Sequence, residues 1–200
     1  MARESEPGIV GRLAESLIAA DLDPVHQFFQ INGVAPPLVT WDPTGGDMSS
    51  KSFDFLIDHW RRTLGDRSWP SEDCIDPVDL RPALGNLLVC EPLEDLSDFR
   101  IRLYGSRLAL EMGRDLTGSY ISDVDPGSYV TTFYLACYRA VAIRGRPLFT
   151  RHLPSSRSFA TDIRRLLLPF GSGSRVTRIL VGVESIPRRP LGRPNWTRRN

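Results

Sequence analysis

Hydrophobic residues recur at helical spacing in three stretches of the chain. The first stretch covers residues 9–20, the second ends at Gly65, and the third covers residues 126–144 and stops before Gly145. Apolar positions at i, i+3, i+4 and i+7 are typical of amphipathic helices, and a following glycine is a common stop. The pattern therefore predicts three helices, the third being the longest in the core. Their apolar stripes are Val10, Leu13, Ala14, Leu17 and Ile18; Phe53, Leu56, Ile57, Trp60 and Leu64; and Val130, Phe133, Tyr134, Cys137 and Val141.

Strand-like runs lie on both sides of the third helix. Residues 99–104 alternate apolar and polar side chains, which is typical of a strand with one buried face. In this alternation Arg100 and Arg102 point away from the core and Leu103 points toward it. The predicted strands are residues 87–91, 99–104, 147–152, 163–170 and 178–186. The Gly-Ser run at residues 171–174 favours a hairpin turn between the last two strands, because glycine tolerates positive φ.

Two Asp-Pro pairs predict helix starts. Asp76-Pro77 and Asp125-Pro126 each combine a capping carboxylate with a proline, whose missing N–H costs nothing at the first helical position. We therefore expect a short helix from Asp76 to about Gly85, and a long helix that begins at Pro126.

Charge separates the two ends of the chain from its middle. Residues 1–50 hold seven acidic side chains against two arginines, whereas the last fourteen residues hold five arginines and no acid. Both ends are predicted to be appendages. We expect an amphipathic helix and linker over residues 1–51, one domain over residues 52–187, and an Arg-rich tail over residues 188–200.

Composition excludes several classes of protein. The chain has neither a secretory signal pattern nor an apolar run of the roughly 20 residues that span a bilayer. Cys74, Cys90 and Cys137 are odd in number and far apart, which argues against a disulfide framework or a zinc site. We expect a cytoplasmic protein with reduced cysteines, no membrane span and no metal.

Three segments, in the predicted order of strands and helices, resemble a PAS domain. They are residues 75–84, residues 99–118 with their Phe-Arg-Ile-Arg-Leu-Tyr-Gly-Ser start, and residues 165–170. The chain is more closely similar to the stand-alone PAS-like family of alphaproteobacteria. The resemblance implies an α+β fold: a PAS-like five-stranded antiparallel sheet with helices on one face, here with an N-terminal helical extension. It also implies a pocket, which in different PAS proteins holds haem, flavin, a small metabolite or nothing.

The residues do not assign a cofactor to such a pocket. Haem needs an axial ligand, usually histidine, and the chain offers only His26, His59 and His152, none of them on the long helix. Solvated or capping roles are expected for His59 and His152. Cysteine-dependent flavin photochemistry needs a cysteine on the helix after the second strand, and the chain has none there. The cofactor is therefore left open.

Catalytic patterns are weak. The sequence has no G-x-S-x-G elbow before a helix, and its few histidines leave little choice of general base. The aspartate pairs at residues 76 and 79, and at 123 and 125, are explained by predicted helix starts. We therefore expect a protein that is not an enzyme, with no catalytic residues.

Two hypotheses for function follow. The first is a sensory or regulatory module that binds a small ligand and signals through association with a protein partner or as a homodimer, with the helix at residues 9–20 as transmitter or dimer contact. The second is a ligand-free interaction adaptor, its core filled by large side chains such as Phe99, Tyr104 and Phe149. Nucleic-acid contact through the Arg-rich tail is a weaker alternative. The predicted pocket residues are Leu103, Leu108, Met112, Phe133, Cys137 and Val141.

Overall fold

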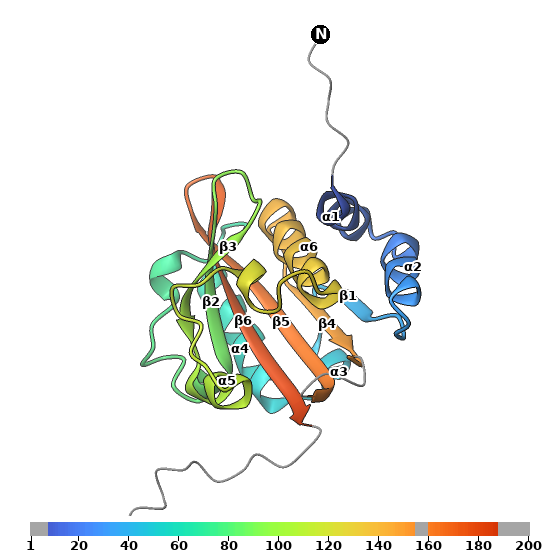
Figure 1. Cartoon of the computed structure of the whole chain (residues 1–200). Helices are drawn as coiled ribbons and strands as arrows, with labels where there is room; N and C mark the ends of the chain where they lie inside the picture. The colour runs from blue at the N-terminus through green and yellow to red at the C-terminus, as the bar shows by residue number, and fades with distance from the viewer. Residues whose placement is uncertain (1–7, 155–159, 188–200) are drawn as a thin grey trace, which may run out of the picture.

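A single antiparallel sheet forms the centre of the computed structural model, which describes residues 8–154 and 160–187 (Figure 1). The order across the sheet is β1-β4-β5-β6-β2-β3, and all neighbours are antiparallel. The strands are β1 (Leu38–Trp41), β2 (Leu87–Pro92), β3 (Phe99–Tyr104), β4 (Leu148–His152), β5 (Ala160–Ser172) and β6 (Arg175–Pro187). The five predicted strands are all present, so the α+β class is confirmed. The expected hairpin joins β5 to β6, and Gly173 adopts a φ of +62° in its turn.

The sheet has six strands where five were expected. β1 pairs with β4, with Leu38 opposite Arg151 and Trp41 opposite Leu148. This strand lies within residues 1–51, which were expected to be a helix and a linker. The β-branched and aromatic residues of Leu-Val-Thr-Trp favour a strand, and pairing with β4 satisfies its backbone groups. The expected connector therefore supplies one edge of the sheet.

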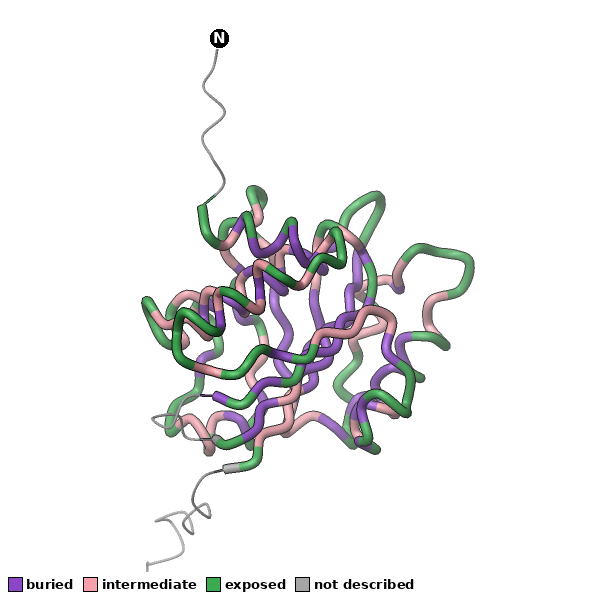
Figure 2. Tube along the Cα trace, turned by 90° about the vertical axis from the view of Figure 1, so that its right-hand side faces the viewer, coloured by how far each residue is buried: buried purple, intermediate pink, exposed green. Residues whose placement is uncertain are grey.

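Helices cover both faces of the sheet, not the one face expected. In Figure 1, α4 (Lys51–Leu64) lies behind the strands and α6 (Tyr129–Arg144) lies in front of them. Side chains alternate along β5, so Leu166 and Leu168 join the core beneath α4 while Leu167 joins the core beneath α6. We call these two sides the α4 face and the α6 face. The buried positions in Figure 2 gather along the strands and on the sheet-facing sides of the helices.

The N-terminal segment packs against α6. α1 (Ile9–Ala19) matches the predicted helix, and α2 (Asp23–Ile31), which was not predicted, follows it. Leu13 and Leu17 of α1 are almost fully buried, and α1 contacts α6. The Arg144 guanidinium donates a hydrogen bond to the Ile18 carbonyl at 3.0 Å. The apolar face of α1 is therefore covered within the same chain.

Both Asp-Pro predictions are wrong in detail. Asp76 accepts a hydrogen bond from the Val78 N–H at 2.7 Å, and the residues after it form turns where a helix was expected. α6 begins at Tyr129, where the Ser128 hydroxyl caps it by accepting from the Thr131 N–H at 3.1 Å. Gly127 has a φ of +75°, which ends the Asp125-Pro126 turn before the helix starts.

Short elements complete the described chain. They are α3 (Gly45–Met48), α5 (Ser106–Met112) and the 3-10 turns η1 (Glu72–Cys74), η2 (Leu84–Asn86) and η3 (Ile121–Asp123). Among the described residues, no helix has the length and apolar character needed to cross a membrane. The Arg-rich tail at residues 188–200 lies outside the described residues.

Candidate ligand pocket

A cavity of about 620 Å³ lies between α6 and the α6 face of the sheet. Its walls come from β2, β3, α5, the segment around η3, the first part of α6, β5 and β6. Most of the wall is apolar, with side chains that include Leu88, Ile101, Ile121 and Val183. Pockets for small molecules typically measure about 300–1,000 Å³ and have mainly apolar walls. The cavity therefore has the size and lining of a small-molecule site.

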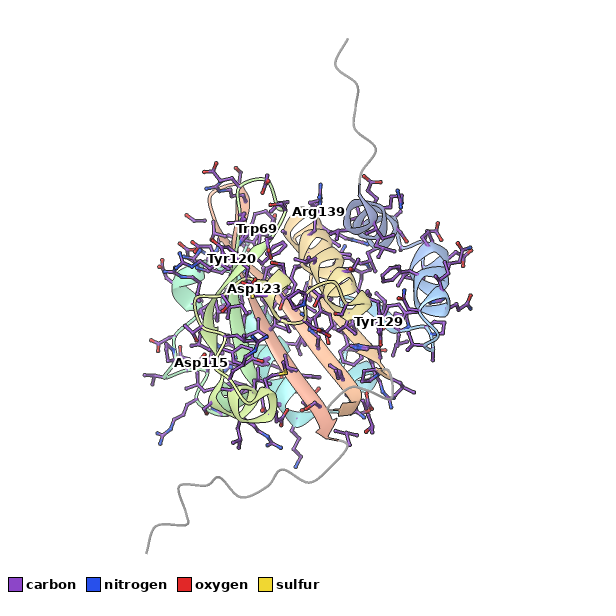
Figure 3. The ribbon with its side chains drawn as sticks, in the orientation of Figure 1. Trp69, Asp115, Tyr120, Asp123, Tyr129 and Arg139 are labelled. Atoms are coloured by element: carbon purple, nitrogen blue, oxygen red, sulfur yellow. The ribbon has the colours of Figure 1, made fainter. Side chains whose placement is uncertain are left out.

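The segment between α5 and α6 closes one side of the cavity. The Gly118 N–H donates to the Ile101 carbonyl, and the Ile101 N–H donates to the Ser119 carbonyl, both at 2.8 Å. Arg114 donates to the carbonyls of Asp123 and Val124 at 3.0 and 2.9 Å. Figure 3 shows Asp123 and Tyr120 on this segment in front of the sheet, with Tyr129 at the start of α6. These bonds hold the segment against β3 as a fixed wall.

A β-bulge in β3 decides which of its side chains reach the cavity. Val89 is opposite Leu103 and Cys90 is opposite Ile101, so Arg102 is the extra residue on β3. The extra residue reverses the alternation after Ile101. Leu103 consequently packs into the core under α4, while Tyr104 lines the cavity.

α6 presents a face to the cavity that is one position away from the predicted one. Val130, Tyr134 and Tyr138, spaced by four residues, line the cavity. The predicted Phe133, Cys137 and Val141 are fully buried but do not line it. The Phe133 ring meets the Phe29 ring of α2 edge to face, with 4.9 Å between centroids. Of the remaining predicted pocket residues, Leu108 and Met112 of α5 line the cavity and Leu103 lies on the α4 face.

Arg165, a buried arginine in the cavity wall, was not among the predicted pocket residues. Its exposed fraction is 2%, and its guanidinium carbon lies 3.7 Å from the Tyr134 ring centroid and 4.9 Å from that of Tyr138. These are cation–π distances. Within the described part of the chain, the Arg165 Nη1 atom has no hydrogen-bond partner. An arginine within a run of buried strand residues, at 163–170, was the signal available in the sequence.

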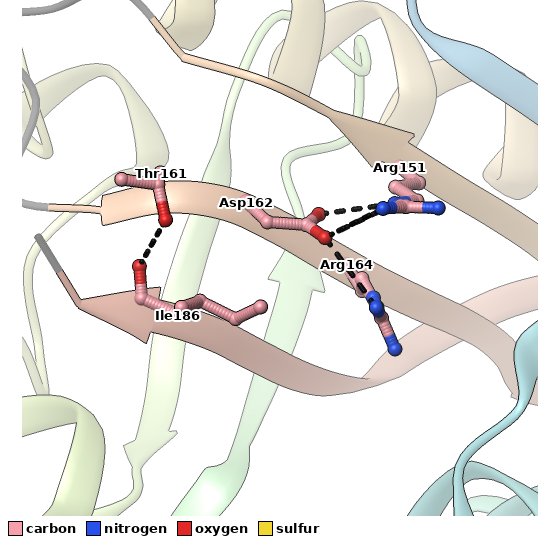
Figure 4. Close-up of polar contacts among 5 residues, drawn as sticks. All are labelled: Arg151, Thr161, Asp162, Arg164 and Ile186. Carbon is pink, nitrogen blue, oxygen red and sulfur yellow. Dashed lines mark hydrogen bonds and ion pairs between the residues drawn. The ribbon is translucent and has the colours of Figure 1, made fainter.

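Two acids near Arg165, Asp162 and Glu111, are engaged with other side chains. Asp162 accepts hydrogen bonds from Arg151, the shortest at 2.9 Å, and from Arg164 at 3.4 Å (Figure 4). Asp162 also lies on the opposite face of β5, because it is three residues from Arg165. At the cavity wall, Glu111 accepts from the Ser185 hydroxyl at 2.5 Å and pairs with Arg107. None of the ion pairs among the described residues includes Arg165, so beyond the two tyrosine rings its charge has no partner there.

His152 is buried beside this site, not solvated as expected. Its exposed fraction is 2%, and its ring packs against the rings of Phe29, Phe133 and Tyr134. Burial lowers the pKa of His152 to about 4, with a further lowering by Arg165 and an opposing effect of Asp162. Desolvation likewise raises the pKa of Tyr134 to about 12. Both side chains are therefore neutral at pH 7, which leaves Arg165 as the cation of this region of the cavity.

The wall does not fit the cofactor chemistry that was weighed for it. No histidine or cysteine is among the described residues that line the cavity, so it offers neither the usual haem ligand nor a flavin-reactive thiol. His59 is also buried, where its Nε2 atom lies 3.0 Å from the Cys74 carbonyl oxygen. Within residues 8–154 and 160–187, no three His, Cys, Asp or Glu side chains form a metal-binding group.

The domain is thus an α+β fold with a pocket between α6 and the antiparallel sheet. A family model described as PAS domain matches residues 48–184. The chain therefore belongs to the PAS domain family, as its segments suggested. Searches of the curated proteins and of the solved structures returned no match. The closer similarity to alphaproteobacterial stand-alone proteins stays a prediction.

Proposed function

We propose that this PAS domain is a cytoplasmic, non-catalytic sensory module that binds a small molecule in the cavity and signals by association. The cavity is the observation that carries this proposal. A pocket of about 620 Å³ with a mainly apolar wall has the size and character of a small-molecule site.

A route for the signal runs through α6. Tyr134 and Tyr138 contact the cavity, while Phe133, on another side of the same helix, contacts Phe29 of α2. α1 also packs on α6. An occupant that is bound more tightly in one position of α6 shifts the population of that position and moves α1 and α2 with it.

The partner surface includes the end of α2. Ile31, the last residue of that helix, has an exposed fraction of 85%. A signalling protein, or a second copy of the chain, is the partner that we propose for this surface. The apolar face of α1 is a weaker choice of dimer contact, because α6 already covers it.

The adaptor hypothesis receives less support. It required a core filled by large side chains, among them Phe99, Tyr104, Phe133, Tyr134 and Phe149. Those rings are present, but Tyr104 and Tyr134 form cavity walls and leave the space between them open. The nucleic-acid alternative depends on the tail, which lies outside the described residues.

Mass spectrometry of the freshly purified full chain tests the proposal. We expect the mass under native conditions to exceed the mass under denaturing conditions, or the unfolding temperature to rise with members of a metabolite panel. Val183→Phe, which places a ring in the cavity, should abolish either effect. Ile143→Phe, at an exposed position of α6, is the control and should preserve it. A chain of sequence mass that no compound stabilises would refute the sensor.

A further inference from the structure

We infer that the ligand is an organic acid with one carboxylate, which pairs with Arg165, and an apolar body that fills the rest of the cavity. This inference rests on the proposed function, because it names the class of molecule that the same cavity binds. It goes beyond that proposal by assigning the recognition chemistry to one side chain.

The first step is the unsatisfied charge of Arg165. A guanidinium stays protonated at any physiological pH, so burial cannot neutralise it. A buried charge is unfavourable unless it is paired and hydrogen-bonded. The rings of Tyr134 and Tyr138 offer their π faces, yet Nη1 makes no hydrogen bond within the described residues. Arg165 lines the cavity, so the free domain holds an unused donor and a positive charge beside a space that an anion can enter.

The second step is the number of negative charges that the cavity accepts. Arg165 is the one cation among the described residues of the wall, whereas Asp125 and Glu111 also line it. A phosphate dianion would meet one cation and two acids. A carboxylate carries a single charge, and its two oxygens match the parallel N–H groups of a guanidinium. Because two acids lie in the same wall as the one cation, a second negative charge on the ligand is unfavourable, so a monoanion that pairs with Arg165 is favoured over a dianion.

The third step is the apolar wall. Aliphatic side chains from β2, β3, α5, η3 and β6 face the same space, together with the tyrosines at positions 104, 129, 134 and 138. Apolar atoms of a ligand gain free energy when they leave water for such a surface. A small hydrophilic acid would leave most of this wall uncovered, so the body attached to the carboxylate is hydrocarbon or aromatic.

Calorimetric titration of the full chain with paired probes tests the inference. The acids are 3-phenylpropanoate and octanoate, their uncharged partners are 3-phenylpropanol and octanol, and inorganic phosphate tests for a free anion. We expect each acid to bind at least tenfold more tightly than its alcohol, and phosphate alone not to bind. Arg165→Met should reduce acid affinity at least tenfold and leave alcohol affinity unchanged. Arg100→Met, at an exposed position of β3, is the matched control.

The stability of the ligand-free variant gives a second readout. Because methionine is apolar and of similar length, Arg165→Met should unfold at a temperature no lower than the wild type, as expected when an unpaired buried charge is removed. A lower unfolding temperature with acid binding retained would assign Arg165 a structural role. Should Arg165→Met fail to fold, Arg165→Lys keeps the charge without the paired donors and is expected to weaken acid binding selectively.

The outcomes separate this inference from the proposed function. Equal binding of acids and alcohols, or acid binding that survives both Arg165 variants, overturns the assignment while leaving the cavity a ligand site. Binding of inorganic phosphate by itself overturns the claim that the ligand has an apolar body. Failure of all five probes also overturns the inference, and the native mass measurement then decides whether the sensor proposal falls with it.

Discussion

The two faces of the sheet are built from alternate residues of the same strands, yet the core under α4 is filled by buried side chains whereas a cavity of about 620 Å³ lies on the α6 face. Neighbouring residues of β6 show the difference. Gly182 faces α4, and a Cβ atom placed there would lie 2.6 Å from a methyl carbon of Leu56, so glycine lets α4 approach the strand closely. Val183 faces the other way and lines the cavity. At this position the absence of a side chain gives α4 direct access to the backbone of β6.

On the α6 face, the helix is packed from both sides. α6 is held from outside by α1 and α2, through contacts such as Phe133 with Phe29. Its cavity side rests on tyrosines and on the segment bonded to β3. α6 also contacts β5 and β6, so the cavity lies beneath the first part of the helix, where Tyr129, Tyr134 and Tyr138 line it.

Of the predicted effects, leucine-to-alanine substitutions should give the largest difference in the free energy of unfolding between the two faces. Leu56→Ala on α4 removes a fully buried side chain from a solid core and is expected to cost about 4 kcal/mol in the free energy of unfolding. Leu108→Ala on α5 removes a side chain that already borders the cavity. The free energy of unfolding should therefore fall only by the transfer term, about 2 kcal/mol. Urea denaturation measures both values, and equal losses would argue against a hollow α6 face.

The next effect concerns pH. The folded protein keeps His152 neutral with a pKa of about 4, below the ordinary value of 6.5, so acid favours the unfolded state, which takes up the proton more readily. This contribution to stability is full above pH 6.5 and is lost as the pH falls toward 4. The loss is about 2 kcal/mol between pH 7 and pH 5.

His152→Phe isolates that effect. Phenylalanine keeps an aromatic ring among Phe29, Phe133 and Tyr134 but cannot take up a proton. Denaturant unfolding at pH 7 and pH 5 should show a smaller loss in the variant than in the wild type. Parallel losses in the two proteins would mean that His152 does not titrate across folding.

Local pattern predicted most of the fold but not its exceptions. The chain has four Asp-Pro pairs, and one that was not used as a prediction, Asp23-Pro24, begins the helix α2. Val25, Phe28 and Phe29 follow it at helical spacing, whereas Asp76 caps a turn. The pair marks a place where a helix can begin, and the apolar residues after it decide whether one does. The strand β1 was not predicted because it is only four residues long. Such an edge strand is defined by its pairing with β4, which the local pattern does not show.

The pocket was harder to predict than the fold because it depends on single positions. One extra residue in β3 exchanges the faces of the sheet to which Leu103 and Tyr104 point. The alternation of apolar and polar residues in the sequence does not reveal such a bulge. On α6, Phe133 and Tyr134 are equally apolar in pattern, and only the placement of α2 determines which one faces the cavity. Arg165 was visible within a buried strand, but its lack of a counter-ion requires the positions of Asp162 and Glu111 in space.

The contrast between a filled core under α4 and a cavity under α6 is tested most directly by adding a ring to each. Val89 of β2 lies in the core under α4, and Val183 of β6 lines the cavity. Over-packing a solid core costs about 1–3 kcal/mol, so Val89→Phe should lower the free energy of unfolding by that amount. Val183→Phe should leave it within about 0.5 kcal/mol of the wild type, because a ring placed in open space displaces no packed side chain. Equal destabilisation by the two variants, measured by urea denaturation, would contradict the account.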